Sequence, residues 1–61
     1  MSDQDIIKEA YHDAVKKIFG VYYGSLVEAS AIPTAVEAAK RRFLASLVVA
    51  RTARDTALEL L

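Results

Sequence analysis

The fold is decided by residues 34–50, TAVEAAKRRFLASLVVA, which contain the densest apolar segment of the chain. Apolar residues recur there every three or four positions, as they do on a helix. They form two stripes that continue to the C-terminus, one of small and one of large residues. The small stripe is Ala35, Ala39, Ser46, Ala50, Ala53 and Ala57, and the large stripe is Phe43, Leu44, Leu47, Val48, Leu58 and Leu61. A helix with one packing partner needs one stripe, so we expect at least two neighbours.

The residues just before this stretch predict a break between two helices. Pro33 cannot continue a preceding helix, and it disfavours helical geometry at Ile32. Thr34 then fits as the N-cap of a second helix, and Glu37 lies where it would complete a capping box. The sequence predicts about 28 helical residues from there, a length of roughly 42 Å.

The N-terminal segment predicts a first helix of similar length. Ser2 and Asp5 have the spacing of a capping box. Apolar residues then recur every three or four positions, at Ile7, Tyr11, Ala14, Val15, Ile18, Tyr22, Leu26 and Ala29. This spacing indicates one amphipathic helix.

Gly20 leaves two interpretations of this helix open. After Lys16 and Lys17, it has the position of a glycine that ends a helix. Alternatively, the helix continues through Gly20 and Gly24, at a cost of about 1 kcal/mol each relative to alanine. We favour the continuous helix because the apolar stripe keeps its phase across both glycines. The two glycines then share a face where a neighbouring backbone could approach.

Chain length argues for self-association. A chain of 61 residues forms one small domain, here a single helical-hairpin domain over residues 1–61. Domains of this size usually need disulfides, metals or oligomerisation, and the absence of cysteine excludes disulfides and thiolate metal sites. We therefore predict an all-α antiparallel helical hairpin that assembles as a dimeric four-helix bundle, since twofold dimers are the commonest closed assembly. A higher homo-oligomer remains open.

Charge and hydropathy argue against several classes of protein, including nucleic-acid-binding, secreted and membrane-spanning proteins. Eight basic and eight acidic residues give a formal net charge of zero, whereas nucleic-acid-binding domains usually carry a basic excess. The acidic N-terminus does not resemble a secretory signal. The longest apolar run is far shorter than the roughly 20 residues that span a bilayer. We expect a cytoplasmic protein without a membrane span, cofactor or metal.

Lys40, Arg41 and Arg42 form the only basic cluster. They could contact the phosphates of a nucleic acid or of an anionic membrane surface. Consecutive helical residues, however, point about 100° apart, so the triplet should fan out. Glu37 can also pair with Lys40 and Arg41. We expect an ordinary solvated face here.

His12 is the only histidine and the only candidate for phosphotransfer. Glu9 and His12 also have the Glu-x-x-His spacing of helix-bundle metal sites, but the second half of the chain lacks enough matching ligands. In an antiparallel hairpin, Arg51 and Arg54 should lie opposite His12 and Glu9, where they would form interhelical ion pairs. We therefore expect neither catalysis nor metal binding at His12.

These observations favour a non-enzymatic, homo-oligomeric helical protein that acts as a protein–protein interaction or regulatory module. Tyr22 and Tyr23 point in different directions on a helix, so one of them is expected at a subunit contact or on the surface. The expected oligomer or partner interface consists of Phe43, Leu44, Leu47, Val48, Tyr22 and Tyr23. The alternatives are a nucleic-acid-binding hairpin dimer that uses the Lys40-Arg41-Arg42 cluster, and a phosphotransfer protein centred on His12. The partner's identity and the choice between dimer and tetramer stay open.

Overall fold

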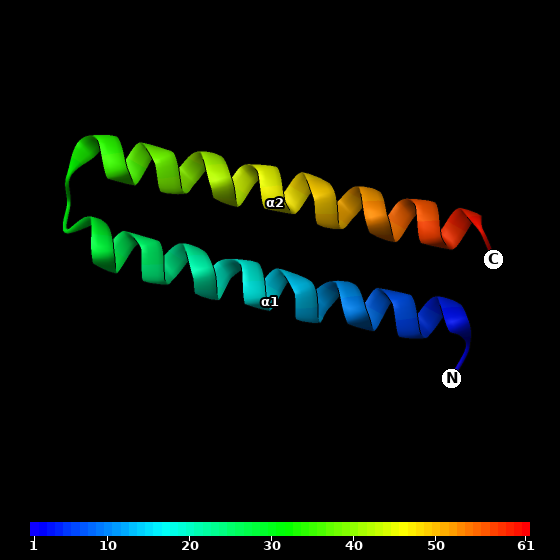
Figure 1. The fold of residues 1–61 in the computed structure, drawn as a ribbon. Coiled ribbons are helices and arrows are strands. Elements are labelled where there is room, and N and C mark those ends of the chain that lie inside the picture. The colour runs from blue at the N-terminus through cyan, green and yellow to red at the C-terminus, as the bar shows by residue number, and fades with distance from the viewer.

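The computed structural model describes all 61 residues as an antiparallel hairpin of two helices (Figure 1). Helix α1 spans Asp3–Ala29 and helix α2 spans Pro33–Glu59, and each contains 27 residues. The chain contains no strand. The prediction of an all-α helical hairpin is therefore confirmed.

The predicted start of α1 is confirmed. The Ser2 hydroxyl accepts a hydrogen bond from the Asp5 backbone N–H at 3.1 Å, and the Ser2 N–H donates to the Asp5 carboxylate at 3.4 Å. This capping box satisfies donors that have no partner within the helix. Helix α1 then runs without interruption through Gly20 and Gly24, so the continuous interpretation is the right one.

The connection between the helices is short and strained. Ser30 and Ala31 both have left-handed backbone conformations, with φ values of 49° and 63°, which cost non-glycine residues about 1–2 kcal/mol each. The chain then enters α2 through Pro33, the first helical residue, with Ile32 at the N-cap position. The prediction that Thr34 caps this helix is wrong. Proline favours the first helical position, where its fixed φ suits the helix and its missing N–H costs nothing.

The hairpin is a single layer of two helices (Figure 1), with Cα dimensions of 44 × 17 × 7 Å. Ala29 and Ala39 are the only residues that it buries. Farther from the loop, the aromatic rings of Tyr22 and Phe43 pack across the seam, with their centroids 4.6 Å apart. Stable domains bury a core between at least two packed layers, and the second layer is missing from a single chain.

The open space beside the two glycines of α1 can be tested by substitution. A Cβ atom added at Gly20 or Gly24 would meet no atom within 4 Å, and neither glycine has a positive φ. We expect Gly20→Ala and Gly24→Ala each to stabilise the protein by up to about 1 kcal/mol, because alanine loses less backbone entropy in a helix. Thermal unfolding followed by circular dichroism measures this gain. A loss of stability would mean that another chain packs closely against these glycines.

Candidate functional site: an uncovered apolar face

The hairpin exposes more surface than a compact monomer should. Its accessible surface is 4697 Å², whereas a folded monomer of this mass is expected to expose about 3,900 Å². The excess is about 800 Å², which equals the area that one partner contributes to a standard-size protein interface.

One flat face is lined by small residues and is called the small-residue face here. A shallow hollow on it lies between Lys17, Val21 and Ser25 of α1 and Arg42 and Ser46 of α2. Two further hollows continue along the same face and share Ser25, Arg42 or Ser46 with the first. They add mostly small residues: Ala14, Ala29, Ala35, Ala38, Ala45, Val49 and Ala50. Three charged residues, Lys17, Glu28 and Arg42, interrupt the apolar surface of this face.

The opposite flat face carries larger apolar side chains and is called the aromatic face here. Phe19, Tyr23 and Leu44 each lie two residues from residues that line the first hollow, which places them about 200° around their helices. They are 56%, 62% and 61% exposed. The rings of Phe19 and Tyr23 lie side by side on α1, with centroids 6.5 Å apart. This exposed group is the strongest candidate for a binding surface.

Half-buried residues extend the aromatic face towards the seam between the helices. They lie three or four positions from its exposed members, on the same side of each helix. They are Val15, Leu26 and Leu47. Lys16 lies three positions before Phe19, Lys40 four positions before Leu44 and Arg51 four positions after Leu47, so three cations border the face.

The six residues expected at an interface do not share one surface. Tyr22 and Phe43 pack against each other within the hairpin, and Leu47 is half-buried. The remaining three, Leu44, Val48 and Tyr23, are exposed. Tyr22 and Tyr23 lie on different sides of the helix, as predicted from the sequence. Phe19 was not among the predicted interface residues, although the four-residue spacing of Phe19 and Tyr23 could have identified the pair.

The basic cluster spreads around α2. Lys40 donates to the Glu37 carboxylate at 3.2 Å, as the sequence predicted. Arg42 instead lines the hollow on the small-residue face with Lys17. Arg41 lies between them in sequence and makes no ion pair. A single anion-binding patch does not form within one hairpin.

The surroundings of His12 differ from the predicted ion pairs. Its ring is exposed and lies beside Tyr11, with centroids 6.3 Å apart. Arg54 does not pair with Glu9, so the prediction of interhelical ion pairs is wrong. The Arg54 guanidinium lies 4.3 Å from the centroid of the Tyr11 ring, a cation–π contact, and its Nε donates to Asp55 at 2.9 Å. That hydrogen bond is the main reason that the pKa of Arg54 is raised.

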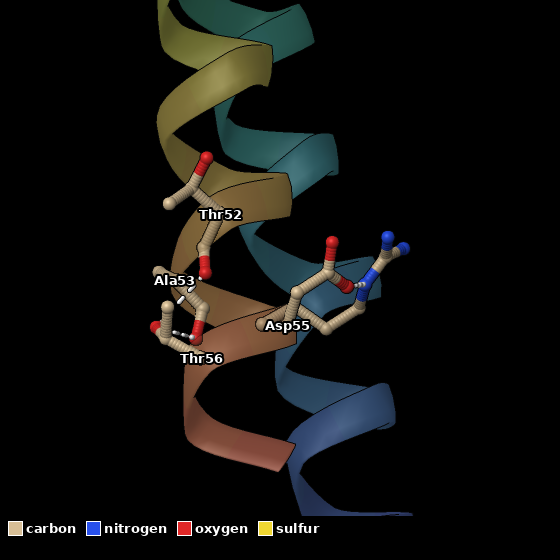
Figure 2. Close-up of polar contacts among 5 residues, drawn as sticks. Thr52, Ala53, Asp55 and Thr56 are labelled. Atoms are coloured by element: carbon tan, nitrogen blue, oxygen red, sulfur yellow. Dashed lines mark hydrogen bonds and ion pairs between the residues drawn. The ribbon is translucent and has the colours of Figure 1, made fainter. Parts of the chain in front are cut away.

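Polar side chains near the C-terminus are satisfied within α2 itself (Figure 2). The Thr56 hydroxyl donates to the carbonyl oxygens of Thr52 and Ala53, at 2.9 and 3.2 Å.

No group of three histidine, cysteine or acidic side chains is placed to hold a metal ion. Neither helix has an apolar stretch long enough to cross a membrane.

A comparison of this chain with protein-family models, curated proteins and solved structures finds no match. Its function must therefore be inferred from its own surface, and the aromatic face is the feature that distinguishes that surface.

Proposed function

We propose that this protein is a non-enzymatic, self-associating helical module. Two copies pack their aromatic faces together as a four-helix bundle, and the assembly acts through contacts with other proteins. The proposal rests mainly on the uncovered surface of the hairpin. Its accessible surface exceeds that of a compact monomer by about 800 Å² per chain, which equals one side of a standard interface. The apolar side chains of the aromatic face suit such burial, because they carry no charge that would have to be desolvated.

The thin core of the hairpin supports the same proposal. Only Ala29 and Ala39 are buried, and both have small side chains that contribute little hydrophobic stabilisation. A domain of this size rarely obtains enough stability from one core. Packing two layers face to face would bury the rings of Phe19 and Tyr23 and the side chain of Leu44. Folding and association are then coupled.

The geometry favours this module over the two alternatives. A nucleic-acid-binding surface would need Lys40, Arg41 and Arg42 on one side, yet Lys40 pairs with Glu37 and Arg42 lies on the small-residue face. Phosphotransfer would need a partner group that orients His12, and no hydrogen bond to its ring is present. Neither alternative accounts for the exposed aromatic rings.

Sedimentation equilibrium of the unmodified chain, over a wide range of concentrations, tests the proposal. We expect the mass of two chains and a melting temperature that rises with protein concentration, because mass action favours the associated state. A mass of four chains would keep self-association but replace the dimer. A single-chain mass with cooperative melting at every concentration would contradict the proposal.

The second half of the proposal, an action through other proteins, needs its own experiment. The tagged chain can be recovered from its native source and the proteins bound to it identified by mass spectrometry. We expect specific protein partners and no enrichment of nucleic acid. Recovery of nucleic acid alone would instead support the alternative based on the basic cluster.

A further inference from the structure

Charge is separated along the length of the hairpin. The two contacts Tyr22–Phe43 and Tyr11–Arg54 give the register of the helices, which brings residues 1–13 and 52–61 together at the open end. This end contains six acidic and two basic side chains, a net charge of −4. The remaining residues, 14–51, contain six basic and two acidic side chains, a net charge of +4. The terminal amine and carboxylate both lie at the open end and cancel.

This separation is hidden in the overall composition, whose net charge is zero. Most of these charges are also uncompensated within the hairpin. Its ion pairs are Glu37–Lys40 and Arg54–Asp55, and both join residues of the same helix. No ion pair links α1 to α2, so the charges of the two ends remain available to a second molecule.

We infer that the second copy binds in reverse orientation, with its acidic open end against the basic half of the first. This inference rests on the proposed self-association and adds the orientation to it. The twofold axis then lies in the plane between the two aromatic faces and runs perpendicular to the helices. A same-direction dimer would place the two acidic ends together and the two basic halves together, and like charges across an interface oppose association.

The positions of individual charges fit the reversed arrangement. Lys40 and Arg41 lie towards the loop, about two to three helical turns from the midpoint of the hairpin. Glu9 and Glu59 lie a similar number of turns from the midpoint, towards the open end. Reversal of one copy about the midpoint therefore brings the basic pair of each chain to the level of the acidic pair of the other. Separations across a helical seam are comparable to the Debye length of about 8 Å at physiological salt, so the attraction persists there.

Distance measurement between spin labels tests the orientation. The chain has no cysteine, so Ala31→Cys in the exposed loop gives one label per chain. Loops at opposite ends of a reversed dimer should be about 40 Å apart, the length of a 27-residue helix, whereas loops on the same side would be within about 20 Å, two helix diameters. Thr56→Cys repeats the measurement near the open end; Thr56 lies about ten residues from the middle of α2, so a reversed dimer should give about 30 Å there.

The outcomes separate the two proposals. A dimeric mass with short distances at both positions would overturn the reversed orientation and leave self-association intact. A single-chain mass with no intermolecular distance would overturn both. Long distances accompanied by masses that grow without limit would indicate head-to-tail chains and would also overturn the closed reversed dimer.

Charge reversal gives an independent test. One variant combines Glu9→Lys with Glu59→Lys, and the other combines Lys40→Glu with Arg41→Glu. In the reversed dimer each variant alone should dissociate at least tenfold more readily than the unmodified chain, and an equimolar mixture should recover affinity as a heterodimer. The deficit should disappear at high salt, because screening removes charge effects but leaves apolar packing. In a same-direction dimer each variant alone would associate more tightly than the unmodified chain, which would overturn the inference.

Discussion

Leu44→Asp is expected to convert the dimer into single chains. Leu44 is 61% exposed in the hairpin and lies on the aromatic face, so its burial depends on the second copy. Burying a leucine contributes about 1.5–3 kcal/mol, the loss occurs twice per dimer, and an unpaired carboxylate is costly to bury. A total of at least about 4 kcal/mol corresponds to a dissociation constant raised roughly a thousandfold. Sedimentation equilibrium and circular dichroism should show a lower mass and reduced helicity.

Val49→Asp provides the matched control. Val49 is 69% exposed on the same helix, but it lines a hollow on the small-residue face. The same carboxylate introduced there should leave the dimer mass unchanged. The opposite result, dissociation by Val49→Asp and a normal dimer with Leu44→Asp, would move the interface to the small-residue face. Leu47→Asp is less informative, because Leu47 is already half-buried by α1 and its loss would also weaken the hairpin.

The two helices were predictable because their signals are local. Apolar spacing, the capping box at Ser2 and Asp5, and the break before Pro33 each depend on residues within one or two turns. The continuity of α1 through Gly20 was also predictable, since the apolar stripe keeps its phase. The start of α2 was misplaced because Thr34 has a good capping side chain, while Pro33 has a stronger backbone preference for the first helical position.

The division of the surface into faces was not predictable to the same degree. The large stripe of α2 was treated as one surface, yet α1 covers part of Phe43 and part of Leu47 and leaves Leu44 and Val48 exposed. Which side of a wide stripe a neighbouring helix covers depends on the rotation of both helices about their axes, and residue spacing alone does not specify it. The partners of Arg54 were likewise not predictable from residue spacing. Its location near His12 was foreseen, but an adjacent carboxylate and the Tyr11 ring compete for its guanidinium.

Phe43→Ala should have the largest effect within a single hairpin. Phe43 is half-buried and its ring packs against Tyr22 with a centroid distance of 4.6 Å. Phenylalanine-to-alanine substitutions in full cores cost 3–5 kcal/mol, so a half-buried site should lose about 2–3 kcal/mol, including the contribution of the aromatic pair. With so few buried residues to compensate, we expect Phe43→Ala to be largely unfolded. Urea denaturation followed by circular dichroism measures the loss.

Two companion variants show whether the ring contact or general apolar volume is responsible. Phe43→Leu keeps most of the buried volume and should lose less than about 1.5 kcal/mol. Phe19→Ala removes an identical ring from the aromatic face, where Phe19 is 56% exposed and its ring lies beside that of Tyr23. Its effect should appear mainly as weaker association that higher protein concentration offsets. Equal urea midpoints for Phe43→Ala and the unmodified chain would mean that the packing of Phe43 on Tyr22 contributes little to the fold.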